Sequence, residues 1–544
     1  MLGAGAFLAG LELMITAVAL PSILADLADW TQLRHASWII NGYLLVYVVA
    51  MPLAGRIADI WGARRLFLFA LVAFTVGSLL AGRAQTLDEL IAARLVQALG
   101  GGIIVPVATA AASHLFGGFG RARALGVIGA LTFLGMAAGP FVGAAVLEGI
   151  HAETALAQQG ITGGLLADAL APAWRWVFYV NVPIGIIAVV VAWAASDGWE
   201  TPRRKGRLDL AGAVLFSGAL AALLGGLTVL DDEFATRFLD LSYPPVPLLL
   251  VGLAVAVVAI VAGIRARDPF LDLRLFRIGA FSSAAFVSLL TGYAFATAIV
   301  GGAVFVDRVL YGGPDQQRVS LGSLAGATAL GALVSGFAVR RFSLRIVTLG
   351  GLLLSAASLW QMGGWSPATR IEDVAVGLAG FGLGFGLTVT PRSAAAVEAV
   401  GPEFFGMASA TVTVARMIGM AVGLSVLVAY GSTTIERLTA QVYATPDSYR
   451  QFVAPSLRER SLKDGLVVDA LEQWAAGEAA RIMVGLFLVA GAVTLVAIPS
   501  ALALRTRRDG RDQAVGSEGA PDVLSAGRRP PGGDRAPAGD GTAA

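Results

Sequence analysis

The sequence predicts an all-α polytopic membrane protein, and two observations carry that prediction. First, 56% of the 544 residues are hydrophobic and only 14% are charged, with a mean hydropathy of +0.75. A chain this apolar cannot present the surface of an ordinary soluble protein to water. Second, its apolar residues form runs of about 20, the helix length that crosses a hydrocarbon core roughly 30 Å thick.

Fourteen such runs are present, and we expect each to be a membrane-spanning helix. An even number places both ends of the chain on one side. The loops that this topology places in the cytosol, one of them beginning at Arg392, carry more Arg and Lys than the outer segments, so we predict a multi-pass protein of the cell (inner) membrane with both termini in the cytosol. The runs are 2–24, 37–55, 66–82, 89–112, 124–148, 174–195, 209–230, 244–263, 280–305, 319–339, 346–363, 374–391, 406–430 and 480–504.

The loop between the second and third runs combines small residues, one carboxylate and three arginines. Lipid cannot accommodate these charges or an open backbone, so we expect a turn at the cytosolic water interface. The pattern resembles the loop between spans 2 and 3 of the major facilitator superfamily, although Ile60 stands where that family usually has a basic residue. The resemblance implies a conformational switch loop, and the residues that match are Gly55, Ala58, Asp59, Gly62, Arg64 and Arg65.

A second copy of this loop follows the tenth run, at residues 336–341, with Val339 in the place of Asp59. We therefore expect a major facilitator fold of two six-helix halves, with a binding cavity between them, plus two inserted helices. The expected parts are 1–195, the N-terminal six-helix half; 196–279, a linker with two extra spans; 280–508, the C-terminal six-helix half with a long outer loop at 432–478; and 509–544, a disordered cytosolic tail.

The number of spans and three further motifs resemble the drug:proton antiporter family with fourteen transmembrane spans, over residues 1–508. Residues 11–21 are similar to its first-span signature, with Glu12 in place of Asp. Residues 174–185 are similar to its start of span 6, and residues 272–277 to its start of span 9. The resemblance implies a proton-coupled exporter (antiporter) that moves hydrophobic or cationic amphiphilic compounds, as in multidrug efflux, by alternating access.

The fifth run is rich in glycine. Glycine lets a neighbouring helix approach closely, and Pro140 removes one backbone donor and bends the helix. In the resembling family this element marks exporters, while close packing without any bearing on the direction of transport is the alternative. The residues of the antiporter-type helix are Gly135, Gly139, Pro140 and Gly143.

Ionisable residues inside the runs are the candidate site residues, because each costs roughly 2.5–3.5 kcal/mol at the membrane centre unless it faces a partner or water. Glu12 is the only acid near the middle of a run. We expect it to be an unpaired carboxylate and the principal proton-coupling group, with a structural hydrogen bond as the alternative. Arg94, followed by Gln97, resembles the arginine that the family associates with proton coupling, and its alternative is a helix anchor.

Two further residues are possible substrate or coupling groups. Arg416 lies in the middle of the thirteenth run and resembles an Arg-Gln-x-Gly element, for which helix packing is the alternative. Asp307 lies at the outer end of the ninth run, at what resembles the family's glutamine position. An ordinary interface pair with Arg308 is the favoured interpretation of Asp307.

Two outer segments are longer than the simplest family pattern. Residues 148–173 form an alanine- and glycine-rich insert that either caps the cavity or is an inert helical loop. In residues 432–478, apolar side chains recur at helical spacing, which favours two amphipathic helices that extend the last two spans outward. Some lipid-exporting members of the superfamily resemble that arrangement, and a solvated loop is the alternative.

Other classes of function find no support. There is no cysteine, the three histidines form no cluster with carboxylates, and no nucleotide-binding Gly-x-x-x-x-Gly-Lys-Ser/Thr pattern occurs, so we expect no metal, no cofactor and no enzyme activity. The expected partners are protons, a small hydrophobic or amphiphilic substrate and membrane lipid, with no nucleic acid, for a protein that is a monomer. A lipid or glycolipid exporter is the main alternative, and a non-transporting membrane receptor or scaffold is another, because fold does not fix function.

Overall fold

The computed structural model describes residues 1–27, 38–150, 158, 164, 170–196, 199, 209–228, 240–266, 269, 272–427, 430, 433–442, 447–460 and 464–504. Across these residues every regular element is a helix, which confirms the all-α fold class. Twelve of the described helices are long and apolar enough to cross a membrane, and α1 (Leu2–Leu27) is a thirteenth if its two halves, bent by 43°, form one span. The chain is therefore a multi-pass membrane protein.

Each of the fourteen predicted runs coincides with helix, although the apolar part of α11 (Leu210–Thr228), which is Ala211–Leu227, is too short to count among the twelve. The sixth run is divided by a break at Val180, and the outer loop 432–478 holds α19 and two short 3-10 helices, η5 and η6. In chain order the elements are α1 (Leu2–Leu27), α3 (Trp38–Trp61), α4 (Ala63–Arg83), α5 (Leu87–Leu115), α6 (Gly118–Gly149), α9 (Ala173–Tyr179), α10 (Asn181–Ala195), α11 (Leu210–Thr228), α13 (Pro245–Arg265), η2 (Leu273–Arg277), α14 (Gly279–Arg308), α15 (Pro314–Ala338), α16 (Leu344–Met362), α17 (Ile371–Ala399), η3 (Pro402–Phe404), α18 (Phe405–Val426), α19 (Thr433–Val442), η5 (Ser448–Gln451), η6 (Pro455–Leu457) and α20 (Gly465–Leu502).

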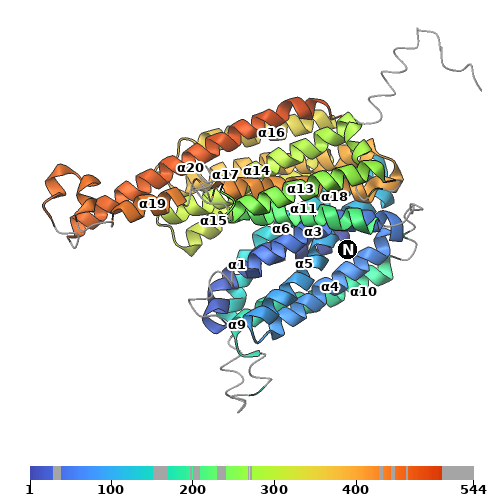
Figure 1. Cartoon of the computed structure of the whole chain (residues 1–544), viewed down its shortest axis with the longest axis horizontal. Helices are drawn as coiled ribbons and strands as arrows, with labels where there is room; N and C mark the ends of the chain where they lie inside the picture. Colours follow the sequence, from blue (N-terminus) through green and yellow to red (C-terminus); the bar gives the residue numbers. More distant parts are fainter. Residues whose placement is uncertain are drawn as a thin grey trace, which may run out of the picture. The chain divides into compact units, whose positions relative to one another are not determined.

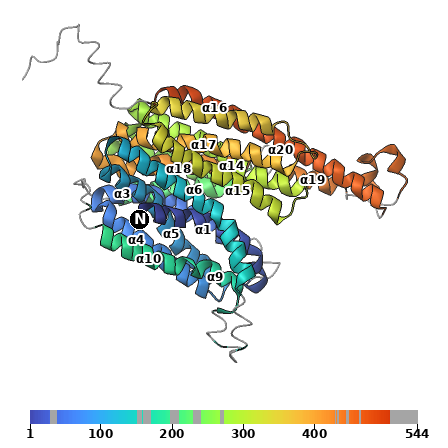
Figure 2. The ribbon, with the colours of Figure 1, turned by 180° about the vertical axis from the view of Figure 1, so that it is seen from behind.

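Helices α1 to α10 pack on one another, and we call this set the N-half; α14 to α18 together with α20 form the C-half (Figure 1). The two sets meet along two seams. At one seam α6 packs against α15 and α17, and at the other α18 packs against α3 and α5 (Figure 2). The residue boundaries of the predicted domains remain a prediction.

The inserted helices α11 and α13 lie against the second seam. α13 packs on α11, and only 6% of its membrane window is buried. α11 reaches both α3 and α18: Leu224 joins a buried cluster with Tyr43 and Tyr47 of α3, and Ser425 Oγ of α18 donates a hydrogen bond of 2.8 Å to the carbonyl of Leu227. The inserted pair therefore covers the line where the N-half meets the C-half.

The charged turn predicted over residues 55–65 is shorter than predicted. α3 continues to Trp61 and α4 begins at Ala63, so Gly62 alone turns the chain. Its φ of 93° lies in the left-handed region that glycine adopts without the steric cost that other residues meet. As a result Asp59 stands on the last turn of a helix and not in an open loop.

The surroundings of Arg392 also differ from the prediction. It was expected in a cytosolic loop, but α17 continues to Ala399 and buries the Arg392 side chain, which is 1% exposed. The run of apolar residues ends at Pro391, yet the proline does not end this helix. Half of the helical residues that follow it are alanine, the best helix former.

Helices occupy both ends of the outer loop 432–478, as the helical spacing predicts. α20 has 38 residues and is about 57 Å long at 1.5 Å per residue, whereas a hydrocarbon core of roughly 30 Å needs about 20 residues. Its first turns project beyond the other helices, with α19 beside them (Figure 1). A small apolar cluster of Val442, Tyr449, Val453, Val467 and Leu471 holds this projection together. We call α19, η5, η6 and the first turns of α20 the outer extension. Most of the predicted insert 148–173 and all of the tail 509–544 lie outside the described residues.

Candidate functional site

Glu12 of α1 and Arg94 of α5 form an ion pair inside the N-half. Their side chains are 0% and 2% exposed. The prediction that Glu12 is unpaired is therefore wrong. A buried carboxylate without a counter-ion costs several kcal/mol, so a neighbouring helix that supplies a cation lowers that cost. The partner is 82 residues away in sequence, so local spacing could not reveal it.

Two more side chains donate hydrogen bonds to Glu12. Thr16, one turn further along α1, donates to Oε1 over 2.9 Å. Asn181, at the start of α10, donates its amide to Oε2 over 2.6 Å and is fully buried. Asn181 is not among the predicted site residues, and the only signal for it is a lone amide inside the apolar pattern of residues 174–185.

Arg94 is held from its other side by polar and aromatic groups. Its Nη1 donates to the side-chain oxygen of Gln97 over 2.6 Å, and the Gln97 amide donates to Ser78 Oγ of α4 over 2.8 Å. The ring of Tyr43 lies 4.0 Å from the guanidinium carbon, which is a cation–π distance. A continuous polar network thus crosses from α1 through α5 to α4 in an otherwise apolar half.

The glycines of α6 place α1, and with it Glu12. A Cβ atom on Gly139 would lie 2.8 Å from Met14 Cβ, and one on Gly143 would lie 3.2 Å from Ile15 Cγ1. Gly135, one turn earlier, faces the backbone of α1 in the same way. These contacts support the packing role of the glycine pattern. The helix continues through Pro140, and a role of this element in the direction of transport stays a prediction.

Asp59 links the two halves at the end of the bundle where α3 ends and α18 begins. Its carboxylate accepts hydrogen bonds from the backbone N–H groups of Gly406, over 2.7 Å, and of Met407, over 2.9 Å. Both groups belong to the first turn of α18, where the unpaired N–H groups and the helix dipole favour a negative charge. Gly55 allows the approach, because a Cβ atom there would lie 2.6 Å from the Gly406 carbonyl oxygen. Asp59 is 3% exposed, so this contact is buried.

The two arginines of the predicted switch loop differ in their surroundings. Arg64 donates from Nε to Ser196 Oγ over 2.9 Å and so ties the start of α4 to the end of α10. Arg65 is exposed. Of the predicted switch residues, Gly55 and Asp59 therefore contact the C-half, Gly62 forms the turn, and Arg64 acts within the N-half.

Asp307 and Arg416 do not join the Glu12 network. Asp307 forms a 3.1 Å ion pair with Arg308, and both side chains are more than half exposed at the end of α14. This is the interface pair that was the favoured interpretation. Arg416 lies instead beside Phe133 of α6 and close to Arg392. Arg392 is a buried group that is not among the predicted site residues.

We expect Arg94→Gln to lower the free energy of unfolding by about 3–5 kcal/mol, because it leaves the Glu12 carboxylate buried without its cation. The thermal midpoint of the purified protein, read by size-exclusion chromatography after heating, measures the loss. The double variant Glu12→Gln with Arg94→Gln should recover much of it, since neither charge is then uncompensated. Arg370→Gln removes an exposed arginine as a control. Equal midpoints for Arg94→Gln and Arg370→Gln would contradict a buried ion pair.

Comparison with known proteins places this geometry in a family. Residues 2–424 match the family model described as Major Facilitator Superfamily. The triacylglyceride transporter of Mycolicibacterium hassiacum is 32% identical over 466 residues, which cover 83% of this chain and 82% of that protein. Multidrug resistance protein 3 of Bacillus subtilis is 26% identical over 426 residues, covering 78% of this chain and 77% of that protein. A crystal structure of a human organic anion transporter has a TM-score of 0.57 at 14% identity and covers 92% of this chain and 97% of its own, a likeness that shows the fold alone.

Proposed function

The chain belongs to the major facilitator superfamily and is a membrane transporter, and from that premise we propose that it exports a lipid, driven by an inward flow of protons. In this proposal it is an antiporter of the cell membrane that acts as a monomer, with both termini in the cytosol. The two halves expose a central binding site to each side of the membrane in turn.

The outer extension is the observation that carries the choice of lipid over drug. A transporter of small water-soluble compounds can release its substrate straight into water, whereas a released lipid needs apolar protein surface beyond the membrane. The extension supplies such a surface, since its buried cluster is flanked by the partly buried side chains of Phe452, Leu457 and Trp474. The relative from Mycolicibacterium hassiacum that carries the name triacylglyceride transporter supports the same choice.

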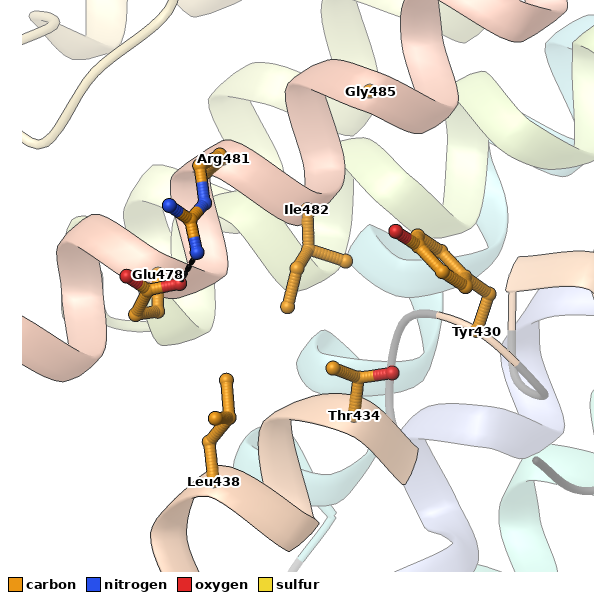
Figure 3. A pocket seen from close by; sticks show the side chains of 7 residues that line it. All are labelled: Tyr430, Thr434, Leu438, Glu478, Arg481, Ile482 and Gly485. Carbon is orange, nitrogen blue, oxygen red and sulfur yellow. Dashed lines mark hydrogen bonds and ion pairs between the residues drawn. The ribbon is translucent and has the colours of Figure 1, made fainter. Parts of the chain in front are cut away.

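A pocket at the root of the outer extension adds to this support (Figure 3). It has a volume of about 240 Å³ and lies between α19 and α20. Leu438 and Ile482 supply apolar wall, while Glu478 and Arg481 form an ion pair at one side. An apolar wall next to a charged pair suits an amphiphile that is leaving the membrane.

Proton coupling is assigned to Glu12 with Arg94. The deprotonated carboxylate is held by Arg94, Thr16 and Asn181. Protonation removes the charge that Arg94 pairs with, so the two protonation states of Glu12 favour different arrangements of α1, α5 and α10. When the halves separate where α3 ends and α18 begins, the hydrogen bonds from α18 to Asp59 are the contacts that break.

Drug export is the second candidate, and the resemblance to multidrug resistance protein 3 of Bacillus subtilis favours it. The paired residues Glu12 and Arg94 serve either substrate class equally. A flux comparison between a labelled triacylglyceride and a cationic dye, in sealed vesicles with an imposed pH gradient, separates the two.

Val467→Asp makes this comparison sharper. Val467 is fully buried in the cluster of the outer extension, and a carboxylate there costs several kcal/mol, so we expect lipid flux to fall by roughly tenfold or more. Val468→Asp is the matched control, because Val468 is the next residue along the chain and its own side chain is 39% exposed. If the protein exports dyes and not lipid, Val467→Asp and Val468→Asp transport the dye at the same rate and neither the wild type nor the variants move the lipid.

A further inference from the structure

We propose that Arg392 and Arg416 form an anion-binding site between the two halves, which holds the carboxylate or phosphate head group of an acidic amphiphilic lipid. The inference rests on the proposed function and deepens it by naming the class of lipid. The site lies in a part of the molecule separate from the Glu12 network.

Arg392 is a buried cation without an acidic partner. It lies on α17, is 1% exposed, and donates from Nη1 to Thr291 Oγ1 of α14. Among the described residues no carboxylate pairs with it. The Thr291 hydroxyl is neutral, so it does not compensate the charge of the guanidinium group. Ser288, one turn before Thr291 on α14, is also fully buried, and its hydroxyl oxygen has no hydrogen-bond partner in the described structure.

Arg416 is a second cation close by. It lies on α18, and its buried Nε has no hydrogen-bond partner among the described residues. Its guanidinium is near enough to that of Arg392 for the two charges to repel each other, and the two groups border the same pair of touching phenylalanine rings. Two like charges brought together out of water cost free energy on two counts, desolvation and repulsion. An anion bound between them offsets both.

Aromatic rings connect the two arginines. The Arg416 guanidinium carbon lies 5.7 Å from the ring centre of Phe133, and that of Arg392 lies 5.1 Å from the ring centre of Phe385. The two rings are themselves in edge-to-face contact, with centres 5.5 Å apart. Phe295 stacks on Phe385 at 4.5 Å. Cationic groups that border a cluster of phenylalanine rings match a ligand with an anionic head and a hydrocarbon chain.

The position of these groups suits a transported ligand. Phe133 belongs to α6 of the N-half, whereas Phe385, Arg392 and Arg416 belong to α17 and α18 of the C-half. A ligand that contacts all of them bridges the seam that alternating access must rearrange. Arg416 is only partly buried, whereas Arg392 is 1% exposed, so Arg416 is the member of the pair that a ligand meets first.

The test uses the purified full-length protein and two fluorescent probes, 11-(dansylamino)undecanoate and its uncharged methyl ester. We expect the acid to bind about tenfold more tightly than the ester, as charge-assisted hydrogen bonds predict. Arg416→Gln and Arg392→Gln should reduce the affinity for the acid to that for the ester, and Arg416→Lys should retain part of the difference. Retained ester binding shows that a variant is folded, and the exposed Arg370→Gln is the matched control.

Competition then identifies the source of the anion. Dodecyl phosphate should displace the acid probe where inorganic phosphate at the same concentration does not, and equal displacement by both would overturn the assignment to a lipid. Equal affinity for acid and ester, or an unchanged preference in Arg416→Gln, would overturn the site itself. Triacylglyceride flux without any preference for the acid would end this inference and leave the proposed function intact. Acid binding without flux of any lipid would leave the anion-binding site but overturn the proposed function, and with it the role of the site in lipid export.

Discussion

Glu12→Gln abolishes transport driven by a pH gradient while the protein still folds and binds its substrate: this is the largest effect on function that we expect. The amide has the shape of the carboxylic acid, and its oxygen still accepts hydrogen bonds from Thr16 and Arg94, which offsets part of the cost of leaving Arg94 without an anion. It cannot take up or release a proton. Flux measured in sealed vesicles, with the gradient verified by a pH-sensitive dye, should fall to the rate of empty vesicles.

Two further variants make the Glu12 result specific. Glu12→Asp keeps the titrating group but shortens its reach to Asn181, so partial flux is expected. Glu148→Gln removes an acid that is 74% exposed at the end of α6 and should leave flux unchanged. Full proton-driven flux in Glu12→Gln would show that another group couples transport to protons.

Asp59→Asn should free the start of α18 from α3. The carboxylate accepts from two backbone N–H groups at a helix N-terminus, and hydrogen bonds to a charged group contribute about 1.5–3 kcal/mol each. The neutral amide keeps one acceptor and loses the charge. We therefore expect this end of the bundle to open at least roughly tenfold more often.

A single cysteine in this cysteine-free chain can report that opening. Ser409 is 2% exposed and donates from Oγ to the Pro106 carbonyl of α5 across the seam. Ser409→Cys should react with a water-soluble thiol reagent about tenfold faster when combined with Asp59→Asn. Glu403→Gln, which removes an exposed acid just before α18, is the matched control. The same labelling rate in both backgrounds would mean that Asp59 does not hold this end closed.

The spans could be predicted from the sequence because the membrane imposes a length and a polarity that each run must meet by itself. The partners of buried charges could not. Glu12 and Arg94 meet through the packing of α1 on α5, and nothing near Glu12 in the sequence indicates that a cation will face it. Arg392 was misplaced for a related reason. Its charge favoured a position in water, whereas the helix that carries it continues to Ala399 and the packed helices bury its side chain.

The resemblance of residues 55–65 to a family motif likewise did not predict the contacts that these residues make. Gly55, Asp59 and Gly62 matched a family pattern, but the pattern gave neither the one-residue turn at Gly62 nor the partner of Asp59. Turn length depends on how far two helices can continue before they collide, which is a property of the packed pair and not of either segment.

The contact of Asp59 with α18 also affects how this protein could change over evolutionary time. Its partners in α18 are backbone N–H groups, which every residue except proline provides. Met407 could therefore be replaced freely as far as this contact is concerned, while Gly406 could not, because a Cβ atom there would lie within 2.9 Å of the Asp59 carboxyl carbon. The link that Asp59 makes between the two halves therefore does not depend on which side chain stands at position 407, but it does depend on glycine at position 406.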